Sequence, residues 1–136
     1  MISLYFTNKD TNTLVPEARN IDVKELTKEP YKTLMNLLIE GPKNEKLERT
    51  IPDETKINKI ELKENILWID LSKEFIENQK AGVEVESRTI YSIVNTMTQL
   101  NEVEAVKFVI DGKEDCAFSD NAISLKDTFV PKEDLT

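Results

Sequence analysis

The sequence contains no histidine among its 136 residues and a single cysteine, Cys116. Without histidine, the Ser-His and Cys-His pairs that activate nucleophiles cannot form, and the commonest zinc ligand is missing. With one cysteine, an internal disulfide bond is impossible. We therefore expect Cys116 to be a small, partly buried apolar residue rather than a reactive one.

Glycine, basic charge and long apolar runs are also scarce. The three glycines cannot make a glycine-rich loop of the kind that holds a phosphate. The 18 basic residues are scattered and are outnumbered by 26 acidic ones, which gives a net charge of −8. Nucleic acid and anionic membrane surfaces are therefore excluded as expected partners. No apolar run approaches the about 20 residues that span a bilayer, and no signal peptide is visible.

Carboxylates are the one catalytic residue type in good supply. Acid–base catalysis needs a carboxyl group whose pKa is raised in a cleft. None of the candidate pairs stands apart from the general acidic background, and a solvated surface is the ordinary place for such residues. The pairs are Asp53 with Glu54, Glu84 with Glu86, Glu102 with Glu104, and Asp111 with Glu114. We predict that the chain is not an enzyme and that it binds no metal and no cofactor.

The clearest pattern in the sequence is a hairpin over residues 57–71. Apolar Ile60 and Leu62 alternate with charged residues, which is the two-residue period of a half-buried strand. A polar turn at residues 63–65 follows, and asparagine tolerates the left-handed conformation that short hairpin turns require. The second strand, over residues 66–71, is apolar at nearly every position.

Side chains alternate across this second strand, so its two faces can be assigned. Leu67, Ile69 and Leu71 share one face, and Ile66 and Trp68 share the other. Either the terminal segments cover Trp68 and close a second small core, or Ile66 and Trp68 form an exposed apolar patch. An exposed patch would mark a protein-binding surface. We take Ile66 and Trp68 as the candidate interaction face.

Three helices are predicted around the hairpin. Residues 30–40 carry an apolar stripe at helical spacing, and Pro30 suits the first helical turn. Residues 84–100 carry a second and longer stripe. Ser72 is a candidate cap for a short helix over residues 73–78.

Four further segments are predicted to be strands. Residues 2–6 form a short apolar run, and a second strand over residues 13–16 is expected to end at Pro16, which lacks a backbone donor. Residues 21–23 and residues 105–110 complete the set.

The order at the centre of the chain is helix, strand, strand, helix, strand. It predicts an α+β fold with a small three- to four-stranded sheet, two main helices on one face, and short strands at both ends of the chain. The last strand can join either member of the hairpin. The length predicts a single domain over residues 1–130, followed by a polar tail over residues 131–136.

Several short strings, in the same order, resemble the GerMN domain, the sporulation and spore germination domain of Gram-positive bacteria. They include Leu4-Tyr5-Phe6, Leu14-Val15-Pro16-Glu17, Leu37-Leu38-Ile39-Glu40-Gly41-Pro42, Ile69-Asp70-Leu71-Ser72, and the run from Val106 to Lys113. The resemblance covers about residues 4–125. It departs from the family pattern at residues 115–118, where relatives usually carry a glycine-containing loop.

The GerMN resemblance implies a fold similar to ring-building-motif domains and a place outside the cytoplasm, often on lipoproteins. It supplies no catalytic residues. We therefore expect a non-catalytic protein-interaction or assembly domain of the cell envelope, linked to sporulation or spore germination and held by a lipid or N-terminal anchor outside this chain. The expected partner is an envelope protein or a second copy. The alternative is a peptidoglycan- or glycan-binding module that uses Trp68 or Tyr5 as a stacking platform.

Overall fold

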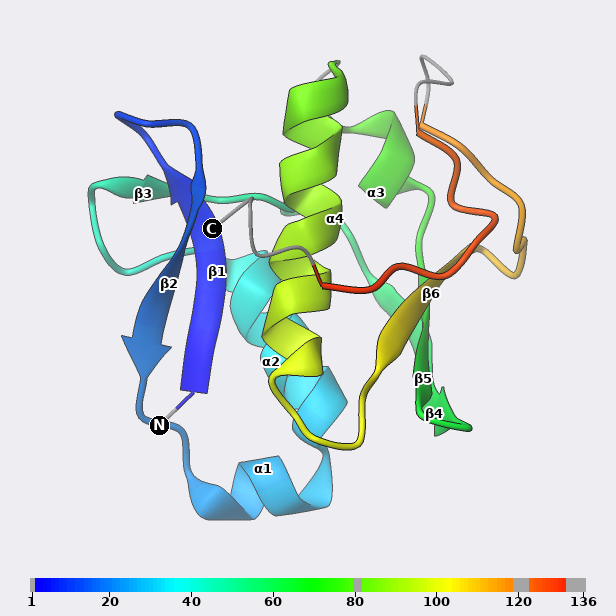
Figure 1. Cartoon of the computed structure of the whole chain (residues 1–136), viewed down its shortest axis with the longest axis horizontal. Coiled ribbons are helices and arrows are strands. Elements are labelled where there is room, and N and C mark those ends of the chain that lie inside the picture. Colours follow the sequence, from blue (N-terminus) through cyan, green and yellow to red (C-terminus); the bar gives the residue numbers. More distant parts are fainter. Residues whose placement is uncertain (1, 80–81, 119–122, 132–136) are drawn as a thin grey trace.

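Two small sheets stand on either side of one long helix in this protein (Figure 1). The computed structural model describes residues 2–79, 82–118 and 123–131. Helix α4 (Val83–Thr98) lies between the sheets, with β1 and β2 on one side and β5 and β6 on the other (Figure 1). The α+β prediction is confirmed. The predicted tail lies outside the described residues from position 132 onward.

The predicted hairpin forms the middle of one sheet, with strand order β4-β5-β6. Strands β4 (Ile57–Lys63) and β5 (Ile66–Leu71) are antiparallel, and β6 (Ala105–Ile110) pairs with β5 in parallel. This pairing settles which hairpin strand the last strand joins. The turn between β4 and β5 has two residues, Glu64 and Asn65, both with positive φ angles of 50° and 67°. Such angles suit the twist of a tight hairpin.

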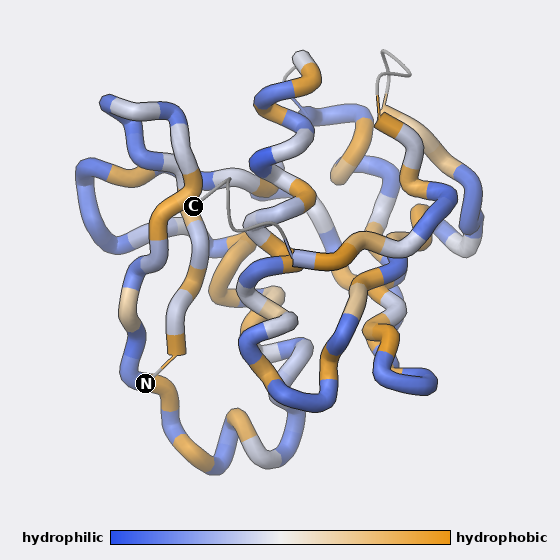
Figure 2. The backbone as a smooth tube through the Cα atoms, viewed as in Figure 1, coloured by the Kyte–Doolittle hydropathy of each residue, from blue (hydrophilic) through white to orange (hydrophobic). Residues whose placement is uncertain are grey.

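One face of this sheet is covered by helices, as predicted. Helix α2 (Pro30–Glu40) packs against β4, and α4 packs against β6. The side chains of Leu67, Ile69 and Leu71 are fully buried beneath them. Hydrophilic residues gather instead in the peripheral loops, including the turn between β4 and β5 (Figure 2).

An aromatic group closes the core where α4 and β6 meet the C-terminal segment. The rings of Phe75 and Phe108 are stacked, with centroids 5.8 Å apart, and Phe118 and Phe129 also join this group. Phe75 lies in α3 (Glu74–Glu77), which begins one residue later than predicted. Ser72 does not cap this helix, because its hydroxyl accepts the Lys56 N–H across the hairpin at 2.9 Å.

The N-terminal strands form a sheet of their own, with order β2-β1-β3. It contains β1 (Ile2–Asn8), β2 (Leu14–Arg19) and the two-residue β3 (Leu47–Glu48). The prediction that the second strand stops at Pro16 is wrong, since β2 continues to Arg19. Pro16 is tolerated because β2 is an edge strand, where one side of the backbone needs no partner.

The predicted strand over residues 21–23 is also wrong, because a short helix begins there. The Asp22 side chain accepts the Lys24 N–H at 2.9 Å and caps α1 (Val23–Lys28). A local cap of this kind favours a helix over an extended segment. Among the described residues, no helix is both long and apolar enough to cross a membrane.

Helix α4 contacts the N-terminal sheet through a polar stripe rather than an apolar one. Ser92 and Thr96 bond to the two backbone groups of Tyr5, and the amide of Gln99 bonds to both backbone groups of Ser3. Ser92 and Thr96 are fully buried. Side chains of this helix region therefore satisfy backbone N–H and C=O groups at one edge of β1. In an ordinary sheet the backbone of a neighbouring strand would form these hydrogen bonds.

Candidate interaction face

Six side chains of β4 and β5 point away from the helices. Cross-strand pairing places them in three opposed pairs on the outer side of the sheet, and we call them the Trp68 face. The pairs are Lys59 with Asp70, Glu61 with Trp68, and Lys63 with Ile66. The two predicted candidates, Ile66 and Trp68, lie together here, and both are half-buried.

Charged side chains surround the Trp68 ring. The Lys63 ammonium nitrogen lies 4.8 Å from the ring centroid, within the range of a cation–π contact. The Glu61 carboxylate lies 2.9 Å from the Lys63 ammonium and 3.6 Å from that of Lys59. The hydrogen bond from Lys63, followed by the charge of Lys59, lowers the pKa of Glu61. The carboxylate therefore stays ionised and holds both lysines across the face.

A shallow hollow of about 180 Å³ lies over this part of the sheet, and its wall extends to β6 and the turn that follows. Val109, Gly112 and Glu114 contribute to that wall. At the same end, the Asn58 amide donates to the carboxylates of both Asp70 and Asp111, at 3.2 and 2.9 Å. The face thus has an aromatic side chain at its centre, with charged and hydrogen-bonded groups around it.

The β6 part of the same sheet surface is closed by the C-terminal segment. Lys107 projects outward from β6 but is only 4% exposed. Its ammonium group donates to the carbonyl oxygens of Phe108, Glu114 and Leu125, at 2.8, 2.5 and 2.9 Å. Burial lowers the pKa of Lys107, and the nearby acidic side chains oppose that shift. The C-terminal segment therefore covers β6 and leaves the Trp68 face open.

This coverage matches neither alternative considered for Trp68 in full. A terminal segment does pack onto β6, but its apolar residues join the main core, and Trp68 stays half-buried. The sequence did not predict that Lys107 binds the C-terminal segment, because a lysine in a strand usually points into solvent. The only signal was its place inside an otherwise apolar strand.

The candidate carboxylates that follow lie in different parts of the structure. Asp53 and Glu54 line a different cavity, and Glu86 is buried within α4. Asp111 accepts the Lys73 N–H and the Asn58 amide. Over the residues that the structure describes, no three histidine, cysteine, aspartate or glutamate side chains are grouped in a way that could hold a metal ion.

Comparison with known proteins identifies the family. A family model described as sporulation and spore germination matches residues 3–116. The chain belongs to this family, the GerMN family. Among curated proteins, none matches it significantly.

Three solved structures share the GerMN fold with this chain. The tandem GerMN domains of the sporulation protein GerM from Bacillus subtilis match with a TM-score of 0.76 and 21% identity, over 96% of this chain and 44% of that one. The first GerMN domain of the same protein gives 0.71 and 23%, over 88% of each chain. A candidate lipoprotein from Clostridium perfringens gives 0.68 and 28%, over 98% of this chain and 88% of the other. This chain thus spans less than half of the tandem structure.

Proposed function

We propose that this GerMN domain is a non-catalytic protein-interaction domain and that its Trp68 face binds a second domain of the same kind. The observation that carries the proposal is the open outer surface of β4 and β5, with Trp68 at its centre. Tryptophan at the middle of a surface with a polar rim is a frequent centre of binding energy in protein interfaces. The sequence supports the non-catalytic part, since it contains no histidine and one cysteine.

Charge favours a second GerMN domain as the occupant. The whole chain carries a net charge of −8, so two copies repel each other over most of their surfaces. The Trp68 face is an exception, because Lys59 and Lys63 balance Glu61 and Asp70. Two such faces can meet without net repulsion, and each lysine can find a carboxylate on the other copy. The tandem GerMN domains of GerM are a natural example of two such domains in one chain.

The location of the protein is part of the same proposal. One relative at 28% identity is a candidate lipoprotein, and the family is associated with sporulation and germination. We infer that this domain works outside the cytoplasm, held at the membrane. There it would contribute to an assembly of envelope proteins.

Sedimentation equilibrium of the isolated chain tests the interaction proposal. The wild type is expected to self-associate with a Kd of about 100 μM, which suits a small and transient interface. Trp68→Lys is expected to remain monomeric. Val23→Lys is the matched control, because Val23 is an apolar residue on α1 that is already 74% exposed. It should associate as the wild type does.

Two results would contradict self-association through this face. One is a wild type that stays monomeric up to about 1 mM, the upper limit of a meaningful weak interface. The other is a Trp68→Lys variant that associates normally. A large loss of thermal stability in Trp68→Lys, absent from Val23→Lys, would assign Trp68 to the core.

A glycan is the second candidate for this face, favoured by the presence of tryptophan itself. It is less well supported, because the Lys63 ammonium group already lies over the ring on which a sugar would stack. Trp68 fluorescence measured with soluble peptidoglycan fragments distinguishes the two. A saturable shift with fragments, in a chain that sediments as a monomer, would favour the glycan.

A further inference from the structure

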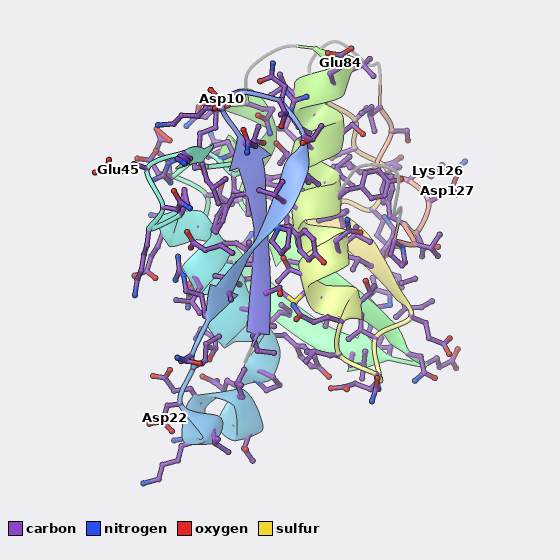
Figure 3. The ribbon with its side chains drawn as sticks, turned by 60° about the vertical axis from the view of Figure 1, so that its left-hand side comes forward. Asp10, Asp22, Glu45, Glu84, Lys126 and Asp127 are labelled. Carbon is purple, nitrogen blue, oxygen red and sulfur yellow. The ribbon has the colours of Figure 1, made fainter. Side chains whose placement is uncertain are left out.

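A cavity lies at the α4 end that carries Glu84, and it shares no lining residue with the hollow of the Trp68 face. Its volume is about 500 Å³, within the range of sites that hold small ligands. Four segments enclose it: the turn between β1 and β2, the stretch after β3, the end of α3 and the start of α4. In Figure 3, Asp10 and Glu84 mark this end of the molecule, and Lys126 and Asp127 lie on another side.

Arg88 supplies positive charge to this cavity. It is half-buried, and one guanidinium nitrogen donates to the Asn12 carbonyl oxygen at 3.1 Å. A guanidinium carries five N–H donors, so this single bond leaves most of its capacity unused. Arg49 also lines the cavity, but its guanidinium donates to the carbonyl oxygens of Ile39 and Glu40 at the end of α2. Both arginines keep unused donors, and Arg88 is the one that is half-buried in the lining.

Negative charge enters the same cavity from β3 and from the stretch after it. Glu48, Asp53 and Glu54 line it, and all three are exposed. Ion pairs found among the described residues involve other groups, so neither these carboxylates nor Arg88 are neutralised by one another. The cavity lining therefore carries groups of both charges that are not paired with each other.

This combination restricts the class of ligand. A metal ion is disfavoured, since these carboxylates do not form a metal-binding group within the described residues. A simple anion would meet the carboxylates, and a simple cation would meet Arg88. The described lining contains no aromatic ring on which a sugar could stack. A ligand that carries one positive and one negative charge can pair with both the carboxylates and Arg88.

We propose that this cavity binds a short peptide with free ends, with its carboxylate on Arg88 and its ammonium group on Asp53 and Glu54. Carboxylate and guanidinium form two parallel hydrogen bonds, which gives both orientation and affinity. A short peptide with free ends carries both charges, and its backbone adds N–H and C=O groups that a single amino acid lacks. The amide side chains of Asn12 and Asn78 line the same space and can bond the peptide backbone.

Tri-alanine with free ends is the probe, because its side chains add little specificity of their own. Binding to the full chain is followed by isothermal titration calorimetry and by amide chemical shifts around Thr89, up to about 10 mM peptide. We expect saturable binding and shifts confined to the cavity. Acetylating the amino end or amidating the carboxyl end should each weaken binding about tenfold, since each removes one charge-assisted contact.

Two variants test the two ends of the peptide separately. Arg88→Gln should weaken binding of tri-alanine about tenfold. This variant should bind the peptide with a free carboxyl end and the peptide with an amidated end equally well. The double variant Asp53→Asn with Glu54→Gln changes two exposed positions. It should bind the peptide with a free amino end and the acetylated peptide equally well. Lys126→Gln is the charge-matched control and should bind as the wild type does. Trp68→Lys should also bind normally, which separates this site from the proposed interface.

The proposal is overturned if tri-alanine produces no saturable signal in the folded wild type. It is equally overturned if both capped peptides bind as well as the free one, or if Arg88→Gln retains the preference for a free carboxylate. Thermal unfolding of each variant confirms that the comparison is made between folded proteins.

Discussion

The Ser92 hydroxyl donates to the Tyr5 carbonyl oxygen at 2.6 Å, across 87 positions of sequence. The same oxygen of Ser92 lies 2.7 Å from the Thr50 hydroxyl, and the Thr89 hydroxyl donates to the Thr50 backbone. One helix face thus joins the N-terminal strand to the segment that follows β3. A buried network of this kind is stable only when every member has a partner.

Removal of the Ser92 hydroxyl should destabilise the protein. Ser92→Ala leaves the Tyr5 carbonyl group and the Thr50 hydroxyl without this buried partner, so we expect a loss of about 1–3 kcal/mol in the free energy of unfolding. Urea unfolding followed by circular dichroism measures it. Thr98→Val is the control, because the Thr98 hydroxyl bonds only to Val94 of its own helix. A Ser92→Ala loss no larger than that of Thr98→Val would contradict the role assigned to Ser92.

Substitution of Lys107 should loosen the C-terminal segment. Lys107→Met keeps the length of the side chain but removes the donor from three carbonyl groups, two of them in buried bonds, at a cost of about 3 kcal/mol. Hydrogen exchange of the Leu125 and Phe129 amides should accelerate, since both bond across this segment. Lys113→Met, at an exposed position, should leave these amides protected. Unchanged protection in Lys107→Met would show that the apolar contacts suffice.

The turn between β4 and β5 offers a stabilising substitution. Glu64 has a φ angle of 50°, a conformation that asparagine adopts more readily than glutamate. Glu64→Asn should therefore raise the free energy of unfolding by about 0.5–1 kcal/mol. Glu64→Gln removes the same charge without this preference and should be neutral. Equal effects of both substitutions would attribute the gain to charge.

Tyr31 should titrate unusually late. Burial, together with a hydrogen bond of 2.9 Å to the Glu102 carboxylate, raises the pKa of Tyr31 to about 12. A raised pKa in the folded state favours the neutral phenol, so the stability that Tyr31 contributes is complete below pH 10 and is lost as the pH rises toward 12. Glu102→Gln should move the pKa back toward 10. Carbon chemical shifts of labelled tyrosine measure both values, and identical titrations would contradict the contact.

The sequence predicted the elements whose signals are local. The hairpin and the helices α2 and α4 each carry their own apolar period, and Gly41, with a φ angle of 95°, ends α2 where the pattern ends. Asp22 was read as part of a strand because its three-residue segment contains two β-branched apolar residues. Its side chain instead accepts a hydrogen bond from the Lys24 N–H and caps a helix.

The arrangement of the two sheets could not be predicted, because it depends on contacts between distant segments. Ser92 and Thr96 look like solvated positions beside the apolar stripe of α4, and only the edge of β1 reveals why they are buried. Ile66 and Trp68 share one face of β5, as the alternation of side chains predicted, and their role as an interaction face stays a prediction. The charge balance of the Trp68 face depends on how β4 is paired to β5, and the cover over β6 depends on Lys107.

The hydrogen bonds from the α4 region to β1 also mean that the edge of β1 stays incomplete until later residues have been made. Ribosomes release the N-terminus first, so β1 and β2 emerge before Ser92, Thr96 and Gln99 have been made. Until those side chains arrive, one edge of β1 is exposed, and an exposed edge can pair with the wrong strand. This edge of β1 is therefore completed only after about residue 99 has been made.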